Sequence, residues 1–175
     1  ELQQTKGRAN IRMGLIAYRD RGDDYITQRY DLSNDISKIY SQLTDFEADG
    51  GGDEPESVNQ ALFEAVHKMS WSKNPNTLKI IFLVGDAVPH MDYKQDVPYP
   101  KTVRMAVKHD IIINTVLAGD AANTREVWQE MVKYSGGRFL AISAQQPVQY
   151  YSTPYDDRIE ALNRDLNGTV IAYGS

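Results

Sequence analysis

Hydrophobic positions are densest at residues 78–84, Leu-Lys-Ile-Ile-Phe-Leu-Val, where six of the seven side chains are apolar. A short unbroken run of this kind is typical of a strand buried on both faces, as in the middle of a parallel sheet. Gly85 and Asp86 end the run, and Pro89 prevents a simple continuation. Asp86 is therefore predicted at the carboxyl end of a central strand, which is the edge where open α/β sheets bind ligands.

Strands and helices are predicted to alternate along the rest of the chain. Strands are predicted at residues 11–18, 25–30, 111–117 and 139–142. Helices are predicted at the N-terminus (1–6), after Ser33 or Asn34, after the loop 48–56, and at 102–109, 123–135 and 156–166. This order predicts an α/β fold, with a doubly wound, mostly parallel sheet, helices on both faces and one antiparallel edge strand. It predicts a single domain over residues 1–175, in which 146–175 form a C-terminal helix and tail.

Composition excludes several classes of function. The chain is 41% hydrophobic and 25% charged, as in soluble globular proteins, and no apolar run is long enough to span a membrane. A net charge of −5 argues against a nucleic-acid partner. Because the chain has no cysteine, disulfides and thiolate chemistry are excluded.

The glycine-rich loop 50–56 has two interpretations. Three consecutive glycines let backbone N–H groups approach an anion, but neither phosphate-binding motif accompanies them, so a nucleotide site is not predicted. Asp53 and Glu56 have the spacing of a helix-capping box. That box explains both carboxylates but not the glycines, which lose much chain entropy on folding.

An enzymatic site is weakly indicated. No Gly-x-Ser-x-Gly elbow occurs, so the usual hydrolase nucleophile is missing. His67 and His109 are interpreted as structural, since His109 lies near a helix end where a cation is favoured. His90 follows the same strand as Asp86 and is the histidine considered for a contact with a ligand.

The order of these motifs resembles a von Willebrand factor type A (VWA) domain over essentially the whole chain. Pro89-His90 after the central strand is most similar to the bacterial and kinase-associated branch. The tail 155–174 is similar to that of bacterial members, which slightly favours a periplasmic or extracellular location. The motifs that carry the resemblance are 13–20, 50–57 with Ala61-Leu62, 81–86, 113–116 with Gly119, and 135–137.

The resemblance implies a metal-ion-dependent adhesion site, in which three loops bind Mg²⁺ or Mn²⁺. Asp86 matches the aspartate of the third loop, Asp53 stands where the second loop has a threonine, and Asp20 is expected to support the site through a ligand. Glu56, His90, Gly51 and Gly52 are expected to contact the partner. The first loop, Asp-x-Ser-x-Ser, is absent, and Asp31–Asp35 is rejected as a substitute because it precedes an amphipathic helix.

Three functions follow from this interpretation. The preferred one is divalent-metal-assisted binding of a protein partner, whose acidic side chain completes the metal shell, without insertion into a membrane. The alternatives are a metal-free structural or assembly domain and a metal-dependent hydrolase using Asp86, Asp53 and His90.

The resemblance also implies a missing first strand between the strands at 11–18 and 78–84. The chain begins with Glu1, which predicts a processed or trimmed piece. Without that strand, backbone N–H and C=O groups along two strand edges would stay unpaired. Burying several of them without a partner would cost more free energy than the ~5–15 kcal/mol stability of a typical domain. A stable species is therefore expected to fill the gap with an upstream segment or a separate chain, or to close it by direct pairing of the two strands.

Overall fold

A computed structural model describes residues 10–47, 54–143 and Ala161. These residues fall in two units, 1–144 and 145–175, and the architecture below belongs to the first. Predictions for residues 1–6 and 50–53 lie outside the described residues, as does all of the predicted helix at 156–166 except Ala161, which is helical. No helix in the described ranges is both long and apolar enough to cross a membrane.

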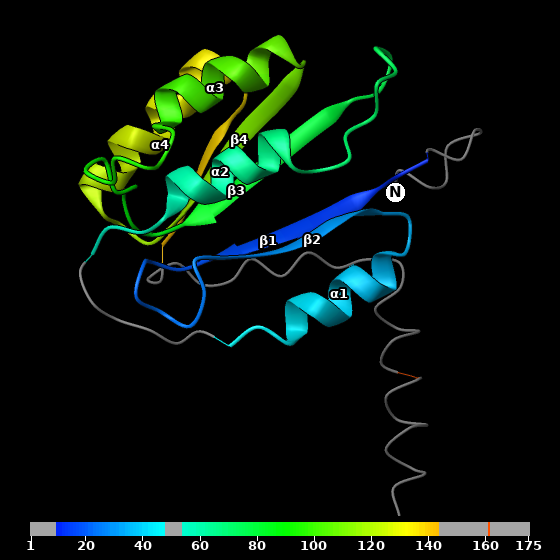
Figure 1. The fold of residues 1–175 in the computed structure, drawn as a ribbon, viewed down its shortest axis with the longest axis horizontal. Coiled ribbons are helices and arrows are strands. Elements are labelled where there is room, and N and C mark those ends of the chain that lie inside the picture. Colours follow the sequence, from blue (N-terminus) through cyan, green and yellow to red (C-terminus); the bar gives the residue numbers. More distant parts are fainter. Residues whose placement is uncertain (1–9, 48–53, 144–160, 162–175) are drawn as a thin grey trace, which may run out of the picture. The chain divides into compact units, whose positions relative to one another are not determined.

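The strands form two separate sheets (Figure 1). β1 (Met13–Tyr18) pairs antiparallel with β2 (Thr27–Ser33). β3 (Lys79–Gly85), β4 (Ile111–Ala118) and β5 (Phe139–Ile142) form a parallel sheet in that order. The fold class is therefore α/β with a parallel sheet and one antiparallel strand pair, as the sequence predicts.

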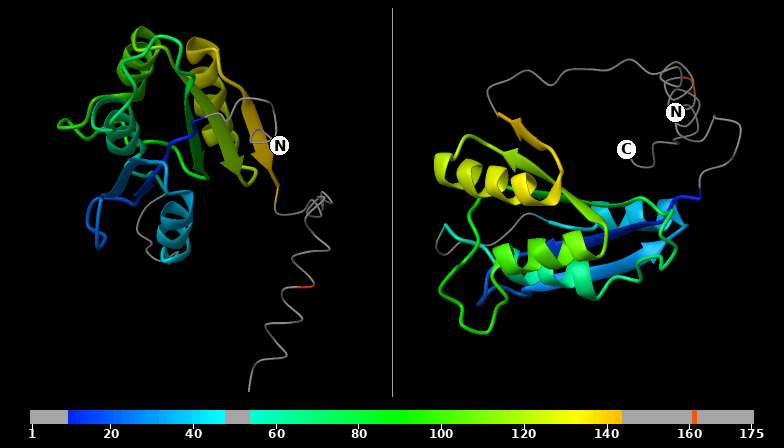
Figure 2. Two further views of the ribbon diagram at one scale, coloured as in Figure 1. Left: turned by 90° about the vertical axis from the view of Figure 1, so that its right-hand side faces the viewer. Right: turned by 90° about the horizontal axis from the view of Figure 1, so that it is seen from above.

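Helices pack against both sheets. α1 (Ile36–Thr44) and α2 (Val58–His67) lie on opposite sides of the β1–β2 pair, while α3 (Tyr99–Lys108) and α4 (Ala122–Ser135) pack on β4 (Figures 1 and 2). One apolar core joins α2, α3 and α4 to β3 and β4; its fully buried large side chains include Leu62, Val103, Ile113, Leu117 and Trp128. Burial of this core holds the carboxyl ends of the strands in place.

β1 and β3 lie side by side without pairing. Both strands run in the same direction, and no backbone hydrogen bond joins them in the described part of the chain (Figure 1). One side chain spans the gap, since the Tyr18 hydroxyl donates to the Val84 carbonyl at 2.8 Å. Direct closure of the two strands therefore does not occur among these residues, and filling of the gap by another segment or chain stays a prediction.

One face of β3 is exposed among the residues that the structure describes, and the opposite face packs on the core. Phe82 is 63% exposed and Val84 52% exposed, whereas Leu83, which points to the opposite face, is buried. The apolar run at 78–84 predicts a strand that is buried on both faces, but the described residues bury only one face of β3.

Several helix ends differ from the prediction. α1 is capped by Asp35, whose carboxylate accepts from the Lys38 amide, so neither Ser33 nor Asn34 is the cap. α3 begins three residues early at Tyr99, because Pro98 stands at its N-cap and Pro100 in its first turn, where a missing N–H costs nothing. α4 begins one residue before the predicted start, with Ala121 at its N-cap, and Gly136 ends it in the left-handed conformation.

Candidate functional site

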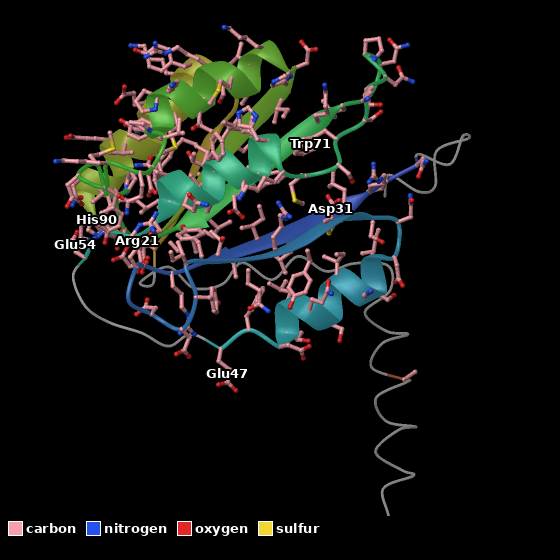
Figure 3. The ribbon with its side chains drawn as sticks, viewed as in Figure 1. Arg21, Asp31, Glu47, Glu54, Trp71 and His90 are labelled. Carbon is pink, nitrogen blue, oxygen red and sulfur yellow. The ribbon has the colours of Figure 1, made fainter. Side chains whose placement is uncertain are left out.

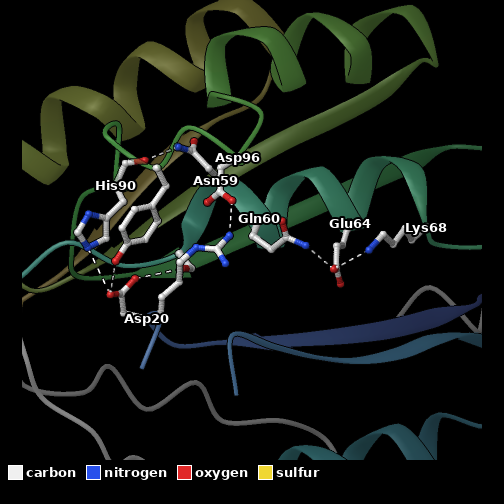
Figure 4. A network of polar contacts seen from close by, with 10 residues as sticks. Asp20, Asn59, Gln60, Glu64, Lys68, His90 and Asp96 are labelled. Atoms are coloured by element: carbon white, nitrogen blue, oxygen red, sulfur yellow. Dashed lines mark hydrogen bonds and ion pairs between the residues drawn. The ribbon is translucent and has the colours of Figure 1, made fainter. Parts of the chain in front are cut away.

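Asp20 is the centre of a polar network at the carboxyl ends of β1 and β3 (Figure 4). It follows β1 and is largely buried, with 15% of its side chain exposed. Its Oδ1 atom accepts from the Ser57 hydroxyl at 3.0 Å, and its Oδ2 atom accepts from the Tyr93 hydroxyl at 2.7 Å. Asp20 therefore ties β1 to the start of α2 and to the loop between β3 and α3.

His90 connects this loop to the same carboxylate. Its Nε2 atom lies 3.4 Å from Oδ2 of Asp20, its Nδ1 atom lies 2.8 Å from Oδ1 of Asp92, and its ring stacks on Tyr93 with centroids 4.0 Å apart. The His90 side chain is only 7% exposed. Two carboxylates and a stacked ring fix the imidazole, so His90 holds the loop in place.

Asn59 and Arg21 make further contacts with the same loop. The buried Asn59 side chain on α2 donates to the His90 carbonyl and accepts from the Tyr99 amide at 2.8 Å. Arg21 pairs with the buried carboxylate of Asp96, and its guanidinium lies 5.2 Å from the Tyr93 ring centroid. The loop that begins at Pro89 is therefore anchored to the fold by several side chains.

The network determines the ionisation of Asp20. Burial raises the pKa of Asp20, but hydrogen bonds from Tyr93, the Arg21 backbone and Ser57, together with the charge of His90, outweigh burial and leave the pKa below its usual value. The hydrogen bond from His90 likewise lowers the pKa of Asp92. Asp20 is therefore held in its charged form.

Glu56 has the opposite electrostatics. Burial raises its pKa, and the charges of Asp20, Asp23 and Asp86 raise it further. Among the described residues, no hydrogen-bond donor reaches its buried Oε2 atom. The charge of His90 acts in the opposite direction but does not outweigh these effects, so the pKa of Glu56 stays above its usual value.

Glu56 is not part of a capping box. Its backbone pairs with the segment after β3, where its amide donates to the Val88 carbonyl at 2.9 Å and its carbonyl accepts from the His90 amide at 3.0 Å. α2 starts only after Ser57, which makes no side-chain cap. The capping interpretation of Asp53 and Glu56 is wrong for Glu56, because a short bridge to the neighbouring loop replaces the first helical turn.

Asp86 lies where the sequence predicts, directly after β3, and its side chain is exposed. Its carbonyl accepts from the Thr124 hydroxyl at 2.9 Å, which anchors the turn to α4. We call Asp20, Glu56, Asp86 and Asp92 the acidic edge; His90 contacts two of them, Asp20 and Asp92. Figure 3 places His90, Arg21 and Glu54 together at this end of the strands.

The ligand set that the resemblance implies is only partly described. Asp53, Gly51 and Gly52 lie outside the described residues, and within the described ones no group of three His, Asp or Glu side chains could hold a metal ion. Both oxygens of Asp20 already accept hydrogen bonds, which fits its predicted supporting role. The residues that the structure describes do not by themselves fit a metal site.

Sequence reasoning missed Ser57, Tyr93, Arg21 and Asn59. Tyr93 and Asp20 are 73 residues apart, and Arg21 and Asp96 are 75 apart, so no local pattern connects them. The row of polar side chains that follows β1 could have indicated this network, because the carboxyl ends of neighbouring parallel strands meet at one edge of the fold.

Comparison with known proteins identifies the fold as that of a VWA domain. The SpRpn10 VWA domain matches with a TM-score of 0.56 and 14% identity, over 78% of this chain and 67% of that one. An uncharacterized membrane spanning protein from Vibrio fischeri matches with a TM-score of 0.33 and 15% identity, over 92% and 77% of the two chains. No protein-family model and no curated protein sequence matches. The VWA-like fold that the motifs suggest is confirmed.

Proposed function

We propose that the chain is a protein-binding module that uses the acidic edge, with the help of Mg²⁺ or Mn²⁺. The observation that carries the proposal is Glu56, a partly buried carboxylate whose Oε2 atom has no donor among the described residues and whose pKa is raised by burial and by three neighbouring carboxylates. Such a surplus of negative charge favours a cation or a cationic group of a partner. The position of these residues after β1 and β3 supports the proposal, because open α/β sheets bind ligands at the carboxyl ends of their strands.

Each residue has a separate role in this proposal. Asp86 and Asp53 would hold the cation, and an acidic side chain of the partner would complete its oxygen shell, since Mg²⁺ requires about six oxygens. Asp20 positions the loop through Ser57, Tyr93 and His90. Glu56, His90, Gly51 and Gly52 would border the contact with the partner.

Divalent cations are expected to raise the melting temperature of the chain. A ligand at about a hundred times its dissociation constant adds ~2.7 kcal/mol to the free energy of unfolding. Melts with and without millimolar Mg²⁺ or Mn²⁺ measure this shift, and Asp86→Asn should remove it. Asp110→Asn is the matched control, because it removes the same charge at the opposite end of the parallel sheet.

The same melts decide against the metal-free alternative. A structural or assembly domain predicts no shift with either ion, or equal shifts in the parent, Asp86→Asn and Asp110→Asn. Either result would refute the metal-assisted proposal.

We propose that the chain is not a hydrolase. His90 is engaged by Asp20 and Asp92 and holds a loop, which supports a positioning role. No metal-dependent hydrolysis of ester or phosphoester substrates is expected above the buffer background. Turnover that His90→Ala abolishes, while the variant keeps the parent's circular dichroism, would overturn this view.

A further inference from the structure

Two histidines and a methionine meet at the end of the molecule opposite the acidic edge. α2 ends at His67, and Met105 and His109 stand one turn apart at the end of α3. The His67 Nε2 atom lies 3.3 Å from the Met105 sulfur, and the rings of His67 and His109 meet edge-on with centroids 6.1 Å apart. None of these three residues belongs to the acidic edge.

The spacing of these atoms suits a metal ion. Metal–imidazole bonds of about 2.0 Å and metal–sulfur bonds of about 2.3 Å, at a tetrahedral angle, place the two ligand atoms roughly 3.5 Å apart. The 3.3 Å separation of His67 Nε2 and Met105 Sδ is close to that value. The His67 ring is also held by Phe63, with ring centroids 4.6 Å apart, so one ligand is positioned in advance.

We propose that His67, Met105 and His109 bind a soft monovalent cation, and that the ion bound in the cell is Cu⁺. Thioether and imidazole ligands select Cu⁺ rather than Mg²⁺ or Ca²⁺. The negative end of the α2 dipole points to this place and favours a cation.

The surroundings favour a single positive charge. His67 and His109 border a cavity of about 600 Å³, which is also lined by Lys73, Lys79 and Lys108 and by one carboxylate, Asp110. The Lys79 ammonium donates to the His109 carbonyl, so one cation already neutralises the end of α3. A divalent ion would meet more repulsion from these lysines than a monovalent one. His67 and His109 are exposed and Met105 is partly buried, which leaves the ligands open to an ion in solution.

Anaerobic competition for Cu⁺ against a chromophoric chelator tests the site on the full chain. One equivalent is expected to bind, and Met105→Leu and His67→Gln are each expected to weaken binding at least tenfold. Met13→Leu, which removes an exposed thioether on β1, is the matched control and is expected to bind as the parent does.

Two results would overturn the proposal. One is affinity that stays the same in the Met105→Leu/His67→Gln double variant. The other is binding of Zn²⁺ as tight as that of Cu⁺, which would contradict the selection of a soft monovalent ion. Because neither Asp86 nor any other residue of the acidic edge is changed, this test is independent of the proposed function.

Discussion

Asp20→Ala is expected to lower the free energy of unfolding by about 2–4 kcal/mol. The change removes the acceptor of the Ser57 and Tyr93 hydroxyls and one of the two carboxylates beside the buried His90. A buried polar group that loses its partner costs roughly 1–3 kcal/mol. The total stays below the sum of these costs, because Asp20 lies partly at the surface and water can replace some of the lost bonds.

Two variants make this measurement specific. Asp20→Asn keeps an acceptor but places an NH₂ group against one of the donors, so an intermediate loss is expected. Asp24→Ala removes an exposed carboxylate from the same turn and is expected to change stability by about 0.5 kcal/mol or less. Urea unfolding measures all three, and an Asp20→Ala value equal to that of Asp24→Ala would show that the network does not stabilise the fold.

The contribution of Asp20 is expected to depend on pH. Because its folded pKa lies below its unfolded value of about 3.9, its ionisation stabilises the chain above that value, and the stabilisation is lost as the pH falls through the folded pKa. The difference between the parent and Asp20→Asn should therefore be constant near neutral pH and shrink in acid. Glu56 has the opposite sign, since its raised pKa makes its contribution most favourable at low pH, with a loss as the pH rises through the folded value.

Hydrogen exchange along β3 is expected to alternate from one amide to the next. A parallel strand directs successive N–H groups to its two sides, and among the residues that the structure describes β3 has a partner, β4, on only one of them. In contrast, the part of β4 at Thr115–Leu117 lies between β3 and β5. Slow exchange at every amide of 115–117, with alternate amides of 80–84 at least tenfold faster, is the expected pattern by NMR.

Uniform protection of 80–84 would contradict an open edge on β3. A dilution series, followed by native mass spectrometry, then separates the causes. Protection that falls on dilution identifies pairing between chains, whereas protection that persists in a monomer shows that another part of the same chain pairs with β3. Alternation in a cooperatively folded monomer would refute the prediction that a stable species must fill the gap.

The sequence predicts the buried strands well because their hydrophobic runs are local. The run at 78–84 becomes β3 within one residue, and 139–142 becomes β5 without change. Helix starts are less predictable, since Asp35 and Ser33 are both good caps and the structure uses Asp35, while the Asn34 side chain between them donates to the distant Ile11 carbonyl. At the start of α3, the Tyr99 amide donates to Asn59, 40 residues away, a contact that no local pattern predicts.

The site is less predictable than the strands for the same reason. Position after a strand correctly identified Asp20 and Asp86 as edge residues, but no spacing rule shows that Tyr93 and Ser57 both donate to Asp20. His90 is an example. Its position in the sequence predicts a contact with a ligand, which stays a prediction, but it does not predict the contacts of its ring with Asp20 and Asp92.

The central claim is that the acidic edge binds a divalent cation, and Mn²⁺ titration followed by NMR tests it most directly. Paramagnetic Mn²⁺ broadens the signals of nearby nuclei, so the amides of Asp86, Glu56 and Asp20 should broaden first, at substoichiometric metal. The amide of Asp110, at the opposite end of the sheet, should keep its line width. Equal broadening at both ends, or none at the acidic edge with Mn²⁺ in excess, would contradict the claim.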